Sequence, residues 1–264
     1  MSSRITKKFN ELRNKNEKAL ITYITGGDPN IDTTFNLVLA MEKAGADIVE
    51  IGIPYSDPTA DGPVIERAAM RALKAGTNIE SVFDMVAKLR VETEVPLVFL
   101  VYYNGIYKYG IEKFLNKCEE KGVDGLIIPD LPLEERKELN EMMKDYPIDL
   151  IALVAPTSED RIKEIVSEAE GFIYCISSRG VTGKRDHFGA DLSDFMKKVR
   201  RYTTTPLAIG FGISSREAVE NLKGLCDGVI VGSAIVEKIE KGIPENDSVE
   251  QVFNFTSQLH KGLE

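Results

Sequence analysis

The chain has 264 residues, of which 43% are hydrophobic and 28% are charged, and its formal net charge is −9. This balance is typical of globular proteins, and the negative charge argues against nucleic acid as a partner. No apolar run approaches the roughly 20 residues that a membrane-spanning helix needs, and the N-terminus lacks an apolar signal region. We therefore expect a cytoplasmic protein without a membrane partner.

The cysteines and histidines give no sign of a disulfide framework or a metal centre. The three cysteines, Cys118, Cys175 and Cys226, are odd in number and far apart, and none belongs to a C-x-x-C motif. The two histidines, His187 and His260, belong to no ligand cluster. We expect buried, reduced thiols and no metal site.

Eight short, almost wholly apolar segments follow one another along the chain, as expected for parallel strands covered on both faces. They span residues 19–25, 47–53, 96–103, 124–130, 149–156, 171–177, 206–212 and 227–233. Helical patterns separate them at residues 32–44, 79–90, 111–121, 133–144, 159–169, 192–202 and 214–222. Two more helical patterns follow the last strand, at residues 234–241 and 249–260.

This alternation predicts an α/β fold, the closed (β/α)8 TIM barrel, because eight βα units fit a chain of this length. An open doubly wound sheet is the alternative. An extra N-terminal helix at residues 5–13 precedes the first strand and is placed where it could plug the barrel floor. No linker or low-complexity segment interrupts the chain, so we expect a single domain over residues 1–264.

A pair of carboxylates marks the second strand and the loop after it. Glu50 lies inside an otherwise apolar strand, and Asp61 follows in the adjoining loop. A carboxylate costs several kcal/mol to desolvate unless it is partnered or protonated, so a strand that keeps one needs a reason. Two acids at the C-terminal end of a barrel strand can divide acid and base work.

Two of the strand-to-helix loops have further signals of function. The second runs from Pro54 to about Gly76, with a short helical pattern at residues 65–73, and such a length is uncommon without a role such as a lid. A solvated acidic loop is the alternative. The sixth, at residues 177–185, has two glycines around a threonine and basic residues nearby, which suits a ligand-covering loop or a plain flexible one.

The seventh and eighth junctions predict a phosphate site. They read GFGIS at residues 210–214 and GSA at residues 232–234. Barrels frequently hold a phosphate on backbone amides of these two junctions, where glycine permits close approach and Ser233 can donate from its amide and its hydroxyl. Tight turns without a ligand are the alternative.

Absent motifs narrow the chemistry. No lysine ends a strand, as a Schiff-base aldolase would need, and no histidine–carboxylate set suits a metal-dependent aldolase. No G-x-G-x-x-G motif opens a dinucleotide-binding unit. Acid–base chemistry without a cofactor, on a phosphorylated small molecule, remains. Tyr174 in the sixth strand faces either this site or the core.

The most specific stretch reads VEIGIPYSDPTADGP at residues 49–63. It is joined by LITYITGGDP at 20–29, PDLP at 129–132, SRGVTG at 178–183, GFGI at 210–213 and VGSAI at 231–235. In these stretches the chain resembles the tryptophan synthase alpha subunit family over nearly its whole length. It departs from the usual family pattern at Tyr23, where Phe is common, at Pro129, and in a sixth loop one residue shorter between arginine and threonine.

The resemblance implies a lyase of tryptophan biosynthesis that cleaves indole-3-glycerol phosphate to indole and glyceraldehyde 3-phosphate by acid–base, retro-aldol chemistry. By analogy, Glu50 protonates indole C3, and Asp61 stabilises the positive charge that develops at the indole N–H. Burial should then raise the pKa of Glu50. The resemblance also implies a beta-subunit partner in an α2β2 complex, with pyridoxal phosphate in that partner and no cofactor in this chain.

Further site residues are implied by the same resemblance. The indole pocket falls on Tyr23, Leu100, Ile127, Leu153 and Tyr174. The phosphate site falls on Gly183, Phe211, Gly212, Gly232 and Ser233. Thr182 is expected to bond to Asp57 and close the sixth loop over the second, and the beta-subunit contact is expected around Pro54 to Asp57 and near Asn104.

Two alternatives to this lyase stay open at the level of sequence. One is another phosphate-binding TIM-barrel enzyme, an isomerase or a synthase, although the synthase would need a lysine at a strand end. The other is a non-catalytic activator of a beta subunit, which has no need for the desolvated pair of Glu50 and Asp61. Turnover by the isolated chain separates the activator from the lyase.

Overall fold

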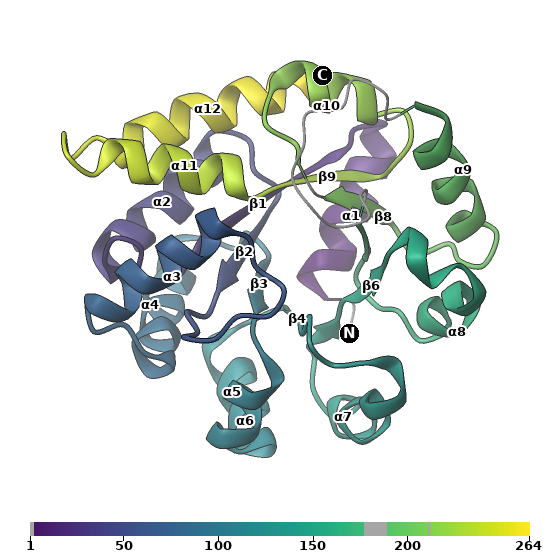
Figure 1. Ribbon diagram of the computed structural model, residues 1–264, viewed down its shortest axis with the longest axis horizontal. Helices are drawn as coiled ribbons and strands as arrows, with labels where there is room; N and C mark the ends of the chain where they lie inside the picture. Colours follow the sequence, from purple (N-terminus) through teal and green to yellow (C-terminus); the bar gives the residue numbers. More distant parts are fainter. Residues whose placement is uncertain (1–2, 177–188, 211) are drawn as a thin grey trace.

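The computed structural model describes residues 3–176, 189–210 and 212–264. Within them, short parallel strands form one sheet in the order β5-β4-β3-β2-β1-β9-β8-β7-β6. The strands are β1 Ala19–Thr25, β2 Ile48–Gly52, β3 Leu97–Leu100, β4 Gly125–Ile127, β5 Asp149–Leu150, β6 Ala152–Val154, β7 Ile173–Ile176, β8 Leu207–Gly210 and β9 Gly228–Val231. Figure 1 shows them at the centre, with helices around the outside.

The two ends of this strand order meet at Ile151. β5 pairs with β4, and β6 pairs with β7. Between β5 and β6, the Ile151 backbone N–H donates to the Leu126 carbonyl at 2.9 Å. The fifth predicted strand, residues 149–156, is therefore present as two segments that together close the sheet. The (β/α)8 barrel is confirmed, and the open sheet is excluded.

The helices follow the predicted periodicity closely. They are α1 Arg4–Lys15, α2 Ile31–Lys43, α3 Pro63–Lys74, α4 Ile79–Glu92, α5 Tyr103–Tyr109, α6 Ile111–Lys121, α7 Arg136–Met143, α8 Ile162–Ser167, α9 Gly189–Arg200, α10 Arg216–Leu222, α11 Ser233–Gly242 and α12 Ser248–Leu263. Short 3₁₀ turns, η1 Leu133–Glu135 and η2 Pro156–Arg161, precede α7 and α8. None of the described helices is long and apolar enough to cross a membrane.

The prediction is wrong at the end of β3, where a helix that was not expected begins, and several other predicted ends differ by a few residues, as at β4 and α8. Residues 96–103 read as a strand because they are apolar and aromatic, yet β3 ends at Leu100 and α5 begins at Tyr103. The Tyr103 backbone N–H donates to Asp130 Oδ1 at 2.8 Å, so a carboxylate from the loop after β4 satisfies a donor in the first turn of α5. This partner is distant in sequence, which explains why the local pattern does not reveal the helix.

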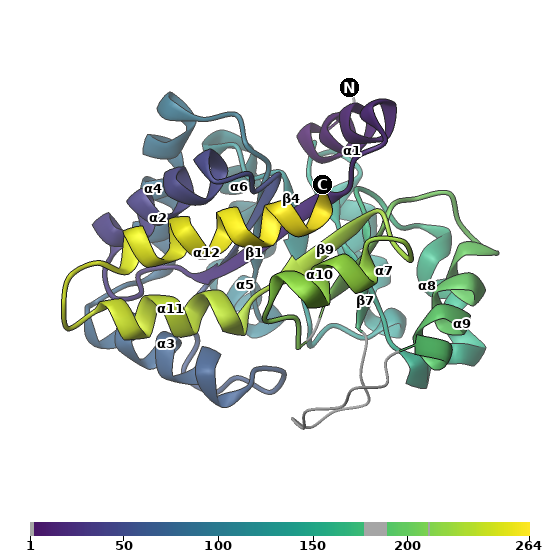
Figure 2. The same ribbon diagram turned by 90° about the horizontal axis from the view of Figure 1, so that it is seen from above.

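The N-terminal helix plugs the barrel floor, as expected. Ser3 Oγ accepts a hydrogen bond from the Thr6 backbone N–H and caps α1. The buried side chains Ile5, Phe9 and Leu12 pack into the same interior cluster as inward-facing residues of the strands. Figure 2 shows α1 at one end of the barrel, apart from the outer helices.

The three cysteines are free and buried, as predicted.

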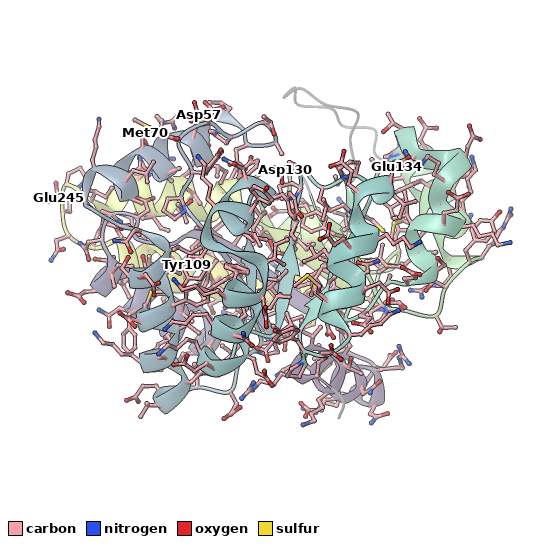
Figure 3. All side chains as sticks on the ribbon, turned by 90° about the horizontal axis from the view of Figure 1, so that it is seen from below. Asp57, Met70, Tyr109, Asp130, Glu134 and Glu245 are labelled. Carbon is pink, nitrogen blue, oxygen red and sulfur yellow. The ribbon has the colours of Figure 1, made fainter. Side chains whose placement is uncertain are left out.

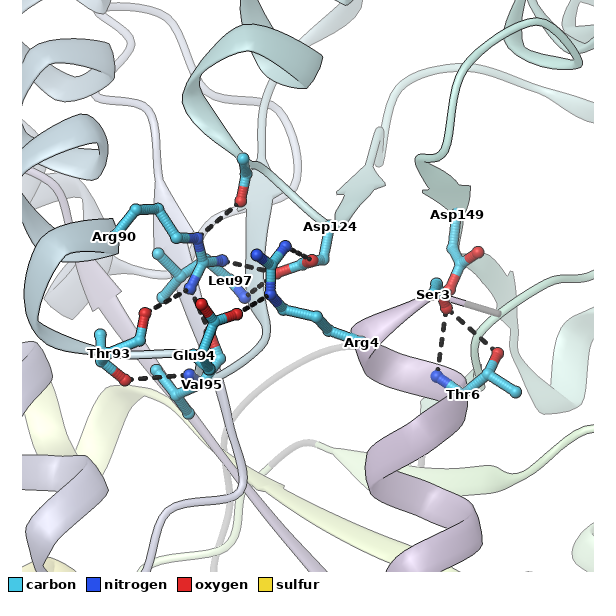
Figure 4. A network of polar contacts seen from close by, with 11 residues as sticks. Ser3, Arg4, Thr6, Arg90, Thr93, Glu94, Val95, Leu97, Asp124 and Asp149 are labelled. Carbon is cyan, nitrogen blue, oxygen red and sulfur yellow. Dashed lines mark hydrogen bonds and ion pairs between the residues drawn. The ribbon is translucent and has the colours of Figure 1, made fainter. Parts of the chain in front are cut away.

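Three carboxylates at this floor, the buried Asp124 and the half-buried Asp47 and Asp227, accept hydrogen bonds from the neighbouring strand. The Leu20 backbone N–H donates to Asp47 at 2.9 Å, and that of Leu97 donates to Asp124 at 2.8 Å. In the same way, the Leu207 backbone N–H donates to Asp227 at 2.9 Å. Asp124 also accepts from Arg4 at 3.0 Å and from Arg90 at 2.6 Å (Figure 4). Each of these charges is therefore partnered, which makes the floor a stabilising end of the barrel.

Candidate active site

Glu50 points into the barrel interior near the C-terminal end of β2. Its neighbours Val49 and Ile51 pack in the outer shell between sheet and helices, while Ile48 packs in the interior. Strand alternation therefore turns Glu50 inward, and only 1% of the residue is exposed. The burial of Glu50 was expected from the sequence, whereas its inward direction comes from the structure.

The carboxyl group of Glu50 is an orphan among the described residues. Its Oε1 is buried and has no hydrogen-bond partner there. Burial alone raises the pKa of Glu50 to about 8. The group is therefore mostly protonated at neutral pH and can give up a proton near that pH, which suits a general acid that becomes a base after transfer.

Tyr23 lies beside Glu50, and Tyr174 packs against the same interior. Tyr23 of β1 is the register partner of Glu50, and the Tyr23 hydroxyl lies 3.3 Å from Thr25 Oγ1. Burial, followed by the charge of Glu50, raises the pKa of Tyr174 of β7. Burial, followed by the charge of Asp61, likewise raises the pKa of Tyr23, so both phenols stay neutral.

Glycines on the neighbouring strands leave room for these rings. A Cβ on Gly52 would lie 2.2 Å from the Tyr23 hydroxyl oxygen, and a Cβ on Gly210 would lie 2.5 Å from the Tyr174 ring. A Cβ on Gly232 would lie 3.4 Å from Tyr23 Cβ, an ordinary contact. Gly52 and Gly210 are therefore required by the shape of the site rather than by backbone conformation.

Asp61 lies in the second loop and is held by Tyr102, a residue that the sequence analysis missed. The Ala60 backbone N–H donates to the Tyr102 hydroxyl at 3.0 Å. Burial raises the pKa of Asp61, while its hydrogen bond with Tyr102 opposes that rise. Burial likewise raises the pKa of Tyr102 to about 12, so the phenol remains a donor to the carboxylate. A tyrosine at the end of a barrel strand was the available signal.

The second loop is fastened to the start of α5. The rings of Tyr55 and Tyr102 stack with centroids 5.1 Å apart, and Asn104 Nδ2 donates to the Tyr55 hydroxyl at 2.7 Å. Pro54 is half-buried and Asp57 is exposed. Figure 3 shows Asp57 at the end of the molecule opposite α1, where Asp130 also lies. The structure thus brings together Asn104 and the second loop, the two segments expected to contact a beta subunit, and that contact itself stays a prediction.

The predicted apolar lining gathers around the same interior. Ile127 is buried in the interior cluster, and Leu100, Leu153 and Tyr174 pack against it while remaining partly exposed. Leu100 also packs against the cluster that contains Tyr23. These residues come from β3, β4, β6 and β7, so the walls of the site are assembled from strands far apart in sequence.

The predicted phosphate site is described in part. Gly232 is the N-cap of α11, has no side-chain cap, and is followed by the exposed Ser233 in the first turn. Gly212 has a φ of +74°, which favours glycine, and no atom within 4 Å of the place a Cβ would take. Both features suit an anion near a helix N-terminus. Thr182, Gly183 and Phe211 lie outside the described residues.

The described residues hold no group of three or more histidine, cysteine, aspartate or glutamate side chains arranged for a metal ion.

A family model described as "Tryptophan synthase alpha chain" matches residues 9–263. The chain belongs to this family. Its tryptophan synthase alpha chain relatives include one from Alkaliphilus metalliredigens, 64% identical over 261 residues, which cover 99% of this chain and 98% of that protein.

Another tryptophan synthase alpha chain, from a Thermoanaerobacter species (strain X514), is 52% identical over 99% of this chain and 100% of its own length. Among solved structures, the tryptophan synthase alpha subunit from Legionella pneumophila has a TM-score of 0.90 at 31% identity, covering 100% of this chain and 99% of that chain. A chain of Mycobacterium tuberculosis tryptophan synthase matches equally, with a TM-score of 0.90, 31% identity and the same coverage.

Membership of the tryptophan synthase alpha chain family assigns the reaction. The chain is a carbon–carbon lyase of tryptophan biosynthesis that cleaves indole-3-glycerol phosphate to indole and glyceraldehyde 3-phosphate. It needs no cofactor of its own for this reaction. An unrelated phosphate-binding barrel enzyme and a purely non-catalytic activator are both set aside by this assignment.

Proposed function

We propose that Glu50 and Asp61 perform the acid–base chemistry of this cleavage at the C-terminal end of the barrel. The observation that carries the proposal is the buried Glu50 carboxyl, which has no described partner and a pKa raised to about 8 by burial. A group that is costly to bury and left unpaired is expected where chemistry rather than stability requires it.

In the proposed mechanism, protonated Glu50 gives its proton to indole C3, and the ring becomes a positively charged indolenine. The Asp61 carboxylate, held by Tyr102, stabilises that charge at the indole N–H in a site with little water. The bond between C3 and the glycerol chain then breaks, and its electron pair restores the aromatic ring. Glu50, now a carboxylate, takes the proton of the glycerol hydroxyl as the aldehyde forms.

The rest of the substrate is placed by the two kinds of surface around this pair. We propose that the indole ring packs among Tyr23, Leu100, Ile127, Leu153 and Tyr174, which provide apolar contact on several sides. The phosphate then lies at the N-terminus of α11, on the amides of Gly232 and Ser233, with Gly212 beside it. Gly183 and Phe211 are also predicted to bind the phosphate, although they lie outside the described residues.

The chain is further proposed to work with a tryptophan synthase beta subunit in an α2β2 complex in the cytoplasm. Pyridoxal phosphate is expected in that partner. The contact is proposed on Pro54 to Asp57 and on Asn104, because the Tyr55–Asn104 hydrogen bond joins these segments into one surface. Closure of the sixth loop through Thr182 and Asp57 stays a prediction, as does the single domain over residues 1–264.

The deciding experiment measures indole release by the purified chain and by its Glu50→Gln variant. Gln keeps the shape and removes the proton donor, so we expect at least a roughly thousandfold loss of kcat. Binding of indole-3-propanol phosphate, which lacks the hydroxyls needed for cleavage, should change by less than about threefold. Asp61→Asn should also lose most of its turnover. Wild-type turnover by Glu50→Gln would refute the assignment.

The control is Glu220→Gln, which changes an exposed carboxylate paired with Arg216 on α10. It should leave kcat and KM unchanged. The same assay with an added beta subunit tests the partner. Faster indole release by the wild-type chain supports the proposed contact, whereas an unchanged rate over a wide range of beta-subunit concentrations contradicts it.

A further inference from the structure

A network of ion pairs joins three segments around the active site. Asp28, in the loop after β1, has a fully buried side chain. Arg71 of α3 donates to both oxygens of its carboxylate, at 2.8 Å from Nε and 2.8 Å from Nη2. The third nitrogen of the same guanidinium, Nη1, donates to Glu240 of α11 at 2.8 Å. Bidentate pairing of this kind fixes orientation as well as distance.

A second arginine on α3 reinforces the link to α11. Arg67 lies one turn before Arg71 and donates to the two oxygens of Glu240 at 2.9 Å and 2.8 Å. It also donates to the Pro63 carbonyl at 3.1 Å, in the first turn of α3. Glu240 therefore receives both arginines, and the two helices are held together along one full turn of α3.

The apolar side of α3 is fixed as well. Ile65 and Ala68 are buried in one cluster with Tyr23 of the indole pocket and Val236 of α11. The helix is thus held by apolar contacts over the pocket and by ion pairs to α11 and to the loop after β1. With both kinds of contact in place, α3 has little freedom to slide or rotate over the barrel.

This arrangement matters for Asp61 because α3 begins immediately after it. Asp61 is followed by Gly62, the N-cap residue, and the helix begins at Pro63. Only one residue separates the carboxylate from the helix, so a shift of α3 moves Asp61 relative to Glu50. Shifts of about 1 Å at a catalytic group are sufficient to slow an enzyme strongly.

Folding stability alone also does not account for the ion pair between Asp28 and Arg71, because desolvation of the charges offsets much of their attraction. Burial of a carboxylate is often no better for folding than an apolar contact of the same volume. Here burial raises the pKa of Asp28, and the pairing with Arg71 offsets that effect only in part. The pair does fix the orientation of α3, because the planar guanidinium of Arg71 contacts two other segments at once.

We propose that Arg71 is a positioning residue for Asp61, and that its pairing with Asp28 and Glu240 sets where α3 holds the catalytic loop. The proposal rests on the role assigned to Asp61 above. It assigns Arg71 no contact with the substrate. A correctly placed α3 is therefore required for turnover more than for substrate binding.

The test uses Arg71→Lys in the full-length chain. Lysine keeps a cation beside Asp28, so the protein should fold, but it cannot form the fork to Asp28 and Glu240 together. We expect kcat for indole release to fall about tenfold, with KM within about twofold of wild type. Glu240→Gln should give a smaller loss, about threefold. The matched control is Arg216→Lys, which changes an exposed arginine–glutamate pair on α10 and should have no effect.

Hydrogen exchange supplies a readout that does not depend on turnover. The Glu66 backbone N–H donates to the Gly62 carbonyl at 3.0 Å in the first turn of α3. Arg71→Lys should speed exchange there by several-fold and leave α10 and the floor strands unchanged. A uniform rise across the barrel, or a kcat within twofold of wild type, would overturn the proposal.

The two proposals can fail separately. If Asp61→Asn keeps wild-type turnover, the role of Asp61 is wrong, and Arg71 has nothing to position. If Asp61→Asn is inactive while Arg71→Lys matches Arg216→Lys in kcat, only the positioning proposal fails. A tenfold loss in Arg71→Lys that falls on KM alone also contradicts it, because that result assigns the network to substrate binding.

Discussion

Two buried carboxylates at opposite ends of the barrel, Asp124 and Glu50, have opposite environments. At the floor, Asp124 is 4% exposed and accepts hydrogen bonds from Arg4, Arg90 and a backbone N–H. At the other end, Glu50 is 1% exposed and its Oε1 has no described partner. Similar burial therefore accompanies full pairing of Asp124 but no pairing of Glu50 Oε1 among the described residues.

The difference separates stability from chemistry. A paired carboxylate at the floor holds strands, helix and N-terminus together, and removing its partners should cost folding free energy without touching the reaction. The buried Glu50 carboxyl, which has no partner among the described residues, costs folding free energy and is retained because its proton can be transferred near neutral pH.

The first prediction concerns the pH dependence of stability caused by Glu50. Its folded-state pKa of about 8 lies above the ordinary value of 4.5, so the folded state holds the proton more tightly than the unfolded state. The stability that Glu50 gains by holding its proton in the folded state is therefore fully present below about pH 4.5, and it is lost as the pH rises through about 8. Glu50→Gln removes this loss, so its unfolding free energy should improve relative to wild type by about 4 kcal/mol between pH 4 and pH 9.

Urea unfolding of both proteins at several pH values measures this difference. Comparing the trend with pH, rather than one value, removes the constant contribution of the buried amide. Glu220→Gln serves as the control and should follow wild type at every pH. Parallel curves for wild type and Glu50→Gln would mean that Glu50 is not the proton-binding group inferred from its burial.

Replacing Arg90 should break the network of hydrogen bonds at the barrel floor. Arg90 donates to Asp124 at 2.6 Å and to the carbonyls of Gly122 and Val95 at 2.8 Å and 2.7 Å. Arg90→Met leaves these acceptors short of a donor and should cost about 3 kcal/mol in urea unfolding, since Arg4 still pairs with Asp124. The kcat of the folded variant should stay at the wild-type value. A selective loss of kcat would contradict the division between the two ends.

The third prediction fills the space beneath Tyr174. A Cβ at position 210 would lie 2.5 Å from the Tyr174 ring, so Gly210→Ala must displace that ring. We expect a stability loss of about 2 kcal/mol and a fall in kcat/KM of at least about tenfold. Gly224→Ala is the matched control, because no atom lies within 4 Å of its Cβ position. Equal behaviour of the two variants would place Tyr174 away from the substrate.

The smallest effect is expected for Tyr102→Phe. The Tyr102 hydroxyl hydrogen bond holds the pKa of Asp61 down against the effect of burial, so its removal should raise that pKa further. The acid limb of the kcat/KM profile should then move to higher pH, with roughly a fivefold loss of kcat near neutral pH. Tyr202→Phe, whose residue is 52% exposed, should leave the profile unchanged. A shift in the opposite direction would separate Asp61 from that limb.

Much of the fold was predictable because the periodic signals were local. Continuous apolar runs such as residues 228–231 indicate a strand buried on both faces, and their regular alternation with helices predicted the barrel. The register that brings Tyr23 opposite Glu50 is not local, but it follows once neighbouring parallel strands are aligned. The residues that the family resemblance assigns to the indole pocket lie on or around the interior clusters, and their contact with substrate stays a prediction.

What the sequence missed depends on side chains that meet across long separations. The start of α5 is satisfied by Asp130, 27 residues beyond Tyr103, and the aromatic run before it favoured a strand. Tyr102 carried no motif, and its role became visible only through its contact with the loop of Asp61. Arg71 and Asp28 are 43 residues apart, and each looks like an ordinary surface charge in isolation.

The barrel, the helix at its floor and the family could be read from the chain alone, because apolar periodicity and a specific motif are local features of the sequence. The pairing of buried charges became visible only in the folded protein. Burial of Glu50 and pairing of Asp124 both arise from neighbours on other strands and helices, and the free energy of a buried charge depends on those neighbours rather than on the residue type.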